Sequence, residues 1–115
     1  MKIYFGFAIA DSMFPEAGTF FRRPSTAQEV ACLFSYEKIT SCVNKSHVPT
    51  IEALRKLTGV TVEVPEVAPK VQLEPFDKFI VMSVRGLPRL GGDRVEYTKE
   101  EIDSAEFKFA IWYIG

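Results

Sequence analysis

The residues of this chain best suited to chemistry are one histidine and an arginine. His47 is the only histidine, and it stands just before a segment with the spacing of a helix. A helix N-terminus carries unpaired N–H groups and roughly half a positive charge, which favours an anion such as phosphate. A titratable imidazole beside an anion site is suited to proton transfer. The alternative for a lone histidine is an ordinary surface or loop residue, and it stays open here.

Arg85 follows an apolar segment and opens a glycine-rich loop, a place where ligand-binding groups are common. The alternative is that Arg85 is an ordinary solvated charge in a loop, which is the favoured interpretation for Arg89 and Arg94. A guanidinium and an imidazole near an anion site are sufficient to cleave an RNA phosphodiester by its own 2′-hydroxyl. The arginine neutralises the non-bridging oxygens and the histidine protonates the 5′-oxygen. This chemistry requires no metal and no cofactor.

Other chemistries fit the sequence less well. Gly91-Gly92 lacks the partners and spacing of a phosphate-binding loop. One histidine and two cysteines ten positions apart do not make a zinc or calcium site. Cys32 and Cys42 lie in apolar surroundings, so we expect reduced, buried thiols and no disulfide. A cysteine nucleophile activated by His47 is the less favoured alternative.

The bulk properties predict one globular domain, residues 1–115. The chain is 47% hydrophobic and 25% charged, as in ordinary globular proteins. Its formal net charge of −1 argues against a general binder of long nucleic acids, which needs a basic excess. No run approaches the ~20 apolar residues that span a bilayer. We therefore expect a soluble, cytoplasmic protein without a membrane partner.

Hydrophobic patterning predicts a mixed α/β fold, with five or six strands and two or three packed helices. The expected strands are residues 2–9, 19–23, 38–43, 60–64, 76–84 and 106–114, the second of them stopped by Pro24. Gly6, inside the first strand, indicates a close approach by another group. In the last strand, Phe107, Phe109, Ile111 and Tyr113 share one face. Ala110, Trp112 and Ile114 share the other, a candidate dimer surface if no helix covers it.

Three helices are expected from their end signals. Ser25 is predicted to cap the first, with Gln28 reaching back. Its expected apolar stripe comprises Ala27, Val30, Ala31, Cys32, Leu33 and Phe34. The second starts near Pro49 and ends at Gly59, with Ile51, Leu54 and Leu57 on its buried face. Thr98 and Glu101 form a capping box for the third, residues 98–105.

The chain resembles a known family, the ring nucleases that archaeal viruses and phages use as anti-CRISPR proteins, which also occur with type III CRISPR effectors. Ser46-His47-Val48-Pro49-Thr50-Ile51, with Leu54, Leu57 and Gly59, is similar to the family's G-H-D-S-T-I and its closing leucines and glycine. Ile80 to Arg85 resembles the family's apolar strand ending in S-Q-R. The first strand and the final strand ending in Trp112-Tyr113 also look like those of the family.

The resemblance implies a homodimer that encloses cyclic tetra-adenylate, the second messenger of type III CRISPR systems. Each subunit would cleave one phosphodiester, giving linear di-adenylate with a 2′,3′-cyclic phosphate and switching off the effectors. By this carry-over His47 is the general acid and Arg85 the phosphate-binding group. The expected ring contacts are Ala10, Asp11 and Ser12 after the first strand, Ser46 and Thr50 beside His47, and Arg89.

The chain also departs from the family pattern. Phe7-Ala8-Ile9-Ala10 stands where members usually have N-A-F-S, and Gly86-Leu87-Pro88-Arg89 replaces glutamates after the arginine. Val48-Pro49 replaces D-S, and Ser46 is the substitute cap we expect. Two other functions therefore stay open: a protein that sequesters a cyclic nucleotide without efficient cleavage, and an unrelated interaction module using the last strand.

Overall fold

The computed structural model describes residues 1–90, 94 and 96–114. Its strands are β1 (Ile3–Gly6), β2 (Phe20–Ser25), β3 (Ile39–Ser41), β4 (Lys78–Arg85) and β5 (Glu106–Ile114). Its α-helices are α1 (Ala27–Tyr36), α2 (Val48–Thr58) and α3 (Lys99–Ser104), and two 3₁₀ turns, η1 (Asp11–Met13) and η2 (Lys45–His47), complete the elements. The expected single α/β domain with a mixed sheet and three helices is confirmed for this part of the chain.

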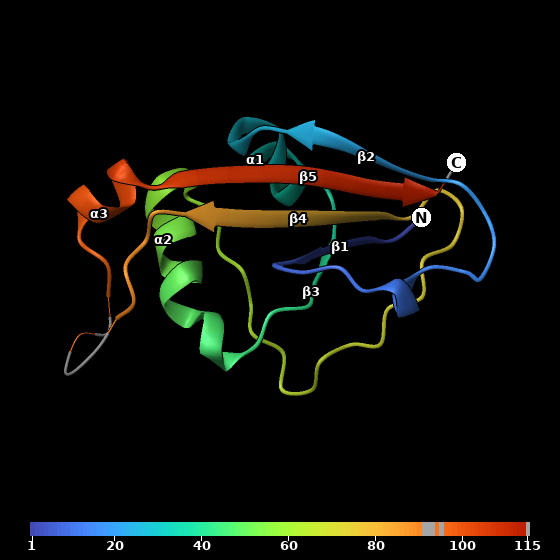
Figure 1. The fold of residues 1–115 in the computed structure, drawn as a ribbon, viewed down its shortest axis with the longest axis horizontal. Coiled ribbons are helices and arrows are strands. Elements are labelled where there is room, and N and C mark those ends of the chain that lie inside the picture. The colour runs from blue at the N-terminus through green and yellow to red at the C-terminus, as the bar shows by residue number, and fades with distance from the viewer. Residues whose placement is uncertain (91–93, 95, 115) are drawn as a thin grey trace.

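The five strands form one sheet in the order β2-β5-β4-β1-β3 (Figure 1). β1 pairs in parallel with β3 and β4, whereas β5 pairs antiparallel with β4 and β2. The carboxyl ends of β1, β3 and β4 therefore meet at one edge of the sheet. In α/β sheets, ligands bind preferentially at this edge.

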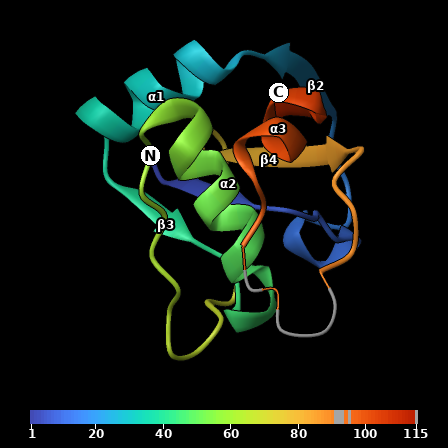
Figure 2. The same ribbon diagram turned by 90° about the vertical axis from the view of Figure 1, so that its left-hand side faces the viewer.

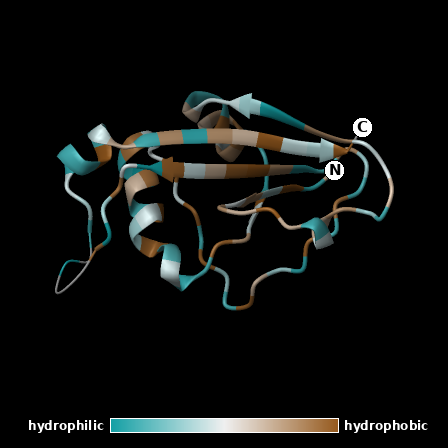
Figure 3. Cartoon of the chain, in the orientation of Figure 1, coloured by the Kyte–Doolittle hydropathy of each residue, from teal (hydrophilic) through white to brown (hydrophobic). Residues whose placement is uncertain are grey.

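One face of the sheet, called the helix face here, lies under α1 and α2 (Figure 2). Val30 of α1 and Leu54 of α2 pack there against strand residues such as Phe5, Ile80 and Ile111, all fully buried. Hydrophobic residues occupy the middle of β4, and they alternate with hydrophilic ones in the first half of β5 (Figure 3). This alternation gives β5 one face for the helices and one for the opposite side.

The opposite side, called the loop face here, is covered at one end by η1 and by the connection between α2 and β4. Val71 and Leu73 of that connection pack on Tyr4 and Phe79, and the Leu73 N–H donates to the Met13 carbonyl at 2.7 Å. Trp112 and Ile114 also belong to this cluster. The expected division of β5 into two faces is confirmed, and irregular segments rather than a helix cover the second face.

Two strand predictions are wrong. Pro24 does not stop the second strand, because β2 runs through it to Ser25 opposite Phe109. β2 is an edge strand, where a missing N–H costs no ladder hydrogen bond. Residues 60–64 form no strand, although Val60 and Val62 are buried as the alternation predicts. The alternation of residues 60–64 therefore reflects which side chains are buried and not pairing with another strand.

The three helices are confirmed, with corrections to their details. Thr26, not Ser25, caps α1 by accepting the Glu29 N–H at 3.1 Å. Cys32 is exposed rather than buried, and Leu57 is 42% exposed rather than part of the core. The Thr98–Glu101 capping box of α3 is present as expected.

Gly6 lies under the ring of Phe79. A Cβ built on Gly6 would stand 3.2 Å from Phe79 Cζ, tighter than nine in ten real Cβ contacts. The close approach that this glycine indicated is confirmed. Among the described helices, none is long and apolar enough to cross a membrane.

Candidate functional site at the carboxyl edge of the sheet

His47 is fixed by a network that ends in its own side chain. Asn44 opens η2, and its side-chain oxygen accepts the Ser46 N–H at 2.9 Å. The Asn44 N–H in turn donates to Nδ1 of His47 at 3.3 Å. This pair is a capping box with histidine in the place of glutamate. Asn44 is therefore the cap of η2, whereas α2 begins at His47 without a side-chain cap. The expectation that Ser46 caps the helix is wrong, because its hydroxyl donates to the Asn44 oxygen.

The imidazole of His47 rests on an aromatic ring. Phe7, the residue after β1, meets it edge to face, with ring centroids 4.7 Å apart. Because Nδ1 accepts a hydrogen bond, the neutral ring carries its proton on Nε2. No other described residue forms a hydrogen bond with Nε2. His47 therefore presents an N–H donor at the half-buried start of α2.

The ends of α2 behave as the sequence predicts. Pro49 lies in its first turn, and Gly59 ends it in the left-handed conformation at φ 80°. The Gly59 N–H donates to the Arg55 carbonyl at 2.7 Å. Thr50 is half-buried in the first turn, on the same turn of chain as His47. These signals fix where the helix starts and hence where the histidine stands.

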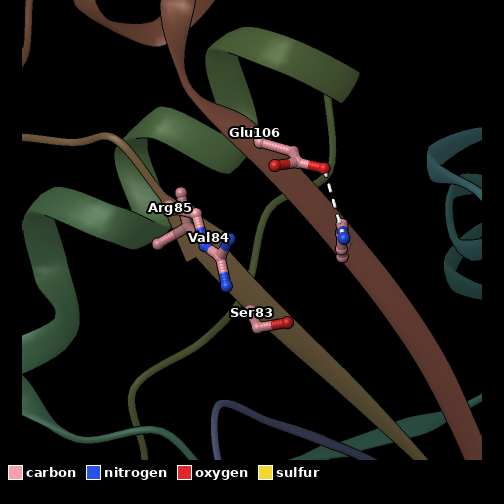
Figure 4. Close-up of a pocket in the computed structure, with 5 residues that line it drawn as sticks. Ser83, Val84, Arg85 and Glu106 are labelled. Carbon is pink, nitrogen blue, oxygen red and sulfur yellow. Dashed lines mark ion pairs between the residues drawn. The ribbon is translucent and has the colours of Figure 1, made fainter.

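Arg85 is the last residue of β4 and lies opposite Glu106 in the β4–β5 register. It lines a shallow depression of about 170 Å³ with Ser83, Val84, Glu106 and Lys108 (Figure 4). The Lys108 ammonium pairs with the Glu106 carboxylate at 3.3 Å. In the described part of the chain, no carboxylate forms an ion pair with Arg85. Among these residues, its guanidinium is thus left to an anion.

His47 and Arg85 lie at the same edge of the sheet but on different sides of it. Met82 is buried under the helices, so Ser83 and Arg85, at alternate positions, point to the loop face. His47 instead leads into α2 and contacts Phe7, which packs against the helix-face core. Among the described residues, no hydrogen bond joins the two side chains. A molecule that touches both must extend around the strand ends.

The other predicted ligand contacts are dispersed. Ala10 is exposed and precedes η1, and its carbonyl accepts the Met13 N–H. Asp11 and Ser12 line a separate depression near Trp112. Arg89 is exposed beyond Gly86, whose φ of 93° turns the chain after β4. The structure therefore groups Ser46 and Thr50 with His47 but sets Asp11 and Ser12 apart from Arg85.

The geometry gives little support to a nucleophilic role for Cys42. Burial raises the pKa of the Cys42 thiol to about 11, which keeps the thiol protonated and unreactive at neutral pH. Within the described residues, no group of three histidine, cysteine, aspartate or glutamate side chains is arranged to hold a metal ion.

Sequence reasoning missed Asn44, Glu106 and Lys108. Asn44 stands three residues before His47, which is the spacing of a capping box, so the sequence alone could have predicted this pair. Glu106 and Lys108 lie two positions apart on one face of β5. Only the strand register shows that they stand opposite Arg85 and Ser83. That register joins positions more than twenty residues apart, so a local pattern does not reveal it.

Comparison with known proteins adds one finding. No family model matches the chain, and no curated protein matches it either. Among solved structures, the chain is similar to B116 of Sulfolobus turreted icosahedral virus, with a TM-score of 0.71. The match covers 98% of this chain and 99% of that one at 14% sequence identity. The chain thus shares its whole fold with a viral protein.

Proposed function

We propose that this chain is a metal-independent ring nuclease that binds cyclic tetra-adenylate and antagonises type III CRISPR signalling in the cytoplasm of a prokaryotic cell. One observation carries the proposal. His47, in the motif resembling the family's, opens an 11-residue helix at the sheet edge where Arg85 ends β4. The likeness of the fold to that of a viral protein is consistent with this role.

In the proposed reaction, a ribose 2′-hydroxyl attacks the adjacent 3′-phosphorus and loses its proton to water, while the bond from phosphorus to the 5′-oxygen of the next nucleotide breaks. Arg85 neutralises the non-bridging oxygens as charge develops. His47 supplies a proton to the leaving 5′-oxygen. Two such cleavages convert the ring into two linear di-adenylates with 2′,3′-cyclic phosphates. The nucleophile belongs to the substrate, so the reaction needs neither a metal nor a bound cofactor.

We further propose that the working unit is a homodimer with one ring across its interface. Two observations support this arrangement. The depression at Arg85 is small and shallow, and within one chain no hydrogen bond joins the side chains of His47 and Arg85. A ring with four phosphates can reach groups on both sides of the strand ends. Two copies of the chain can enclose a ring that the shallow site of one copy leaves exposed.

The hydrogen bond to His47 favours a second candidate, a protein that sequesters the ring without efficient cleavage. A general acid must carry protons on both imidazole nitrogens before it donates one. A proton on Nδ1 is incompatible with the Asn44 N–H that this nitrogen accepts. Cleavage therefore requires the ligand to displace this bond, whereas binding through the Nε2–H does not.

One experiment separates these functions. Radiolabelled cyclic tetra-adenylate is incubated with excess protein in a metal chelator, and products are resolved over time. We expect cleavage to fall about 10²–10⁴-fold in His47→Ala, with Lys45→Ala, an exposed neighbour in η2, as the control. Arg85→Ala should weaken both retention of the ring and its cleavage, because it removes the phosphate contact.

The outcomes are distinct. Retention of intact ring by wild type and His47→Ala alike supports the sequestering protein and rules out the enzyme. If neither retains nor cleaves the ring, both candidates fail and an interaction module using the last strand becomes the better hypothesis. Unchanged binding and cleavage in Arg85→Ala removes that residue from the site.

A further inference from the structure

A second depression on the loop face lies at the other end of β5 from Arg85. It has a volume of about 610 Å³ and is lined by residues of η1, the segment after it, β2 and β5. The lining residues are Asp11, Ser12, Phe14, Pro15, Glu16, Phe20 and Trp112. Lys108 and Trp112 are four residues apart on one strand, about 13 Å, so the two depressions are separate.

Aromatic rings make up much of this lining. The rings of Phe14 and Phe20 have centroids 4.4 Å apart, and those of Phe14 and Trp112 are 6.0 Å apart. The three rings come from three different segments and are tilted to one another rather than stacked. A group of ring faces around a hollow attracts a cation through the ring quadrupoles, most strongly at tryptophan.

The charged groups of the depression are both acidic. Asp11 and Glu16 line it, and no lysine, arginine or histidine does. Neither carboxylate forms an ion pair within the described part of the chain. Outside the lining, Arg22 lies directly opposite Trp112 in the β2–β5 ladder, so two carboxylates are set against one nearby guanidinium. The lining itself is acidic and attracts a cation rather than the phosphates of a nucleotide.

The segment carrying Asp11 and Ser12 is held in place before any ligand arrives. The Gln72 side-chain amide donates to the Ser12 carbonyl at 2.7 Å. The Leu73 N–H donates to the Met13 carbonyl at the same distance. Both bonds join η1 to a segment some sixty residues away. A preformed site avoids the cost of ordering a loop on binding.

From these observations we propose that this depression binds an organic cation of the alkylammonium class, the group carried by polyamines and by lysine side chains. The ammonium contacts the carboxylates of Asp11 and Glu16, and its alkyl chain lies on Phe14, Phe20 and Trp112. This site uses neither His47 nor Arg85, but it assigns Asp11 and Ser12, which the family resemblance implied as ring contacts, to a different ligand. The proposed ligand is positively charged, whereas cyclic tetra-adenylate is negatively charged.

The test uses Trp112, the only tryptophan of the chain, as the reporter. Its fluorescence is followed while spermidine, or an end-blocked Gly-Lys-Gly peptide, is added at constant ionic strength. We expect a saturable change with at least one of the two. Spermidine alone identifies a free polyamine as the source, and a stronger response to the peptide identifies a protein side chain. The same peptide with its lysine acetylated lacks the charge and should give no response.

Variants locate the binding. Asp11→Asn with Glu16→Gln should weaken binding about tenfold, since two carboxylate contacts are lost. The control, Glu100→Gln with Asp103→Asn on α3, removes the same charge elsewhere and should leave the affinity unchanged. Phe20→Leu keeps an apolar side chain but removes a π face, and should weaken binding about threefold.

Three results would overturn the proposal. The first is no response to either cation up to about 10 mM, a range that detects even weak, millimolar association. The second is an equal response to the acetylated peptide, which would show contact with the alkyl chain alone. The third is saturation by adenosine but not by the cations, which would make the depression a base-binding site.

Discussion

The two faces of the central sheet are covered in different ways. On the helix face, α1 and α2 present side chains at helical spacing to buried strand residues. On the loop face, η1 and the connection before β4 cover only the end near Tyr4 and Phe79. The other end, around Arg85 and Lys108, is open and polar.

This difference separates stability from ligand binding. Regular helices bury one apolar stripe continuously and leave little room for unpaired polar groups. Irregular segments cover less of a sheet, and the two depressions proposed above as ligand sites lie on the loop face. Other depressions with charged linings lie beside the helices, one near Phe34 and Lys38 and one near Lys56 and Asp103. His47 is a proposed ligand-binding residue on the side of the helices. It stands at the start of α2, and so it lies at the carboxyl edge of the sheet and not beneath the helix.

The largest stability effect should distinguish the two faces. Leu54→Ala, at a fully buried position of α2, should lower the free energy of unfolding by about 3–4 kcal/mol through lost burial and a cavity. Leu73→Ala, which is 4% exposed among irregular segments, should cost about 2 kcal/mol, because such surroundings collapse more easily. Urea denaturation measures both. Equal losses would contradict the proposed difference between the faces.

A smaller effect of opposite sign is expected on the loop face. Phe76 has a φ of 76° and is 80% exposed, in a turn where the Asp77 N–H donates to the Glu74 carbonyl at 3.0 Å. Glycine is preferred at this turn position, because left-handed backbone costs other residues about 1–2 kcal/mol. Phe76→Gly should therefore raise the free energy of unfolding by about 1 kcal/mol.

The control for Phe76 is alanine. Phe76→Ala removes the same exposed ring but keeps a Cβ, so its stability should stay close to wild type in thermal denaturation. If alanine and glycine stabilise equally, the exposed ring rather than the backbone is the source of the effect.

The smallest effect concerns pH on the helix face. Hydrogen bonds from Arg23 and Ser25 lower the pKa of Glu29 to about 2. A carboxyl whose pKa is lowered by folding adds stability above its unfolded pKa near 4.5. That stability disappears as the pH falls towards the folded value. The Arg23 and Glu29 side chains are 43% and 37% exposed, so solvent screening limits the contribution to about 0.5 kcal/mol.

The measurement for Glu29 is urea denaturation of wild type and Glu29→Gln from pH 6 to pH 2. The stability difference should be constant above pH 5 and shrink steadily below pH 4.5. Glu66→Gln, an exposed residue of the α2–β4 connection, controls for the change in net charge. A difference that persists at pH 2 would show that the carboxyl contributes by packing and not by charge.

Features set by neighbours in sequence were predictable. Pro49 and Gly59 mark the ends of α2, Thr98 and Glu101 cap α3, and the alternation of residues 106–114 gives β5 with its two faces. The position of His47 before a helix was equally local. Each depends on contacts within about one turn or one strand, where propensity and periodicity act directly.

Features set by distant pairing were not predictable. Pro24 is tolerated because β2 is an edge strand, and residue order alone does not reveal an edge. Leu57 fits the helical stripe but is 42% exposed in the folded chain. The partners of Arg85 follow from the register with β5. The distribution of the predicted ligand contacts over two depressions likewise depends on tertiary packing.

The two borders of the sheet limit how copies of this chain can associate. At one border, β2 contains Pro24, which offers no N–H to an incoming strand. At the other, β3 has only three residues, too few for a stable additional ladder. Short or proline-interrupted outer strands protect proteins against uncontrolled strand addition and fibre growth. If two copies associate as proposed above, their contact is therefore expected to use a face of the molecule and not a sheet border, so the strands themselves do not build an extending ribbon.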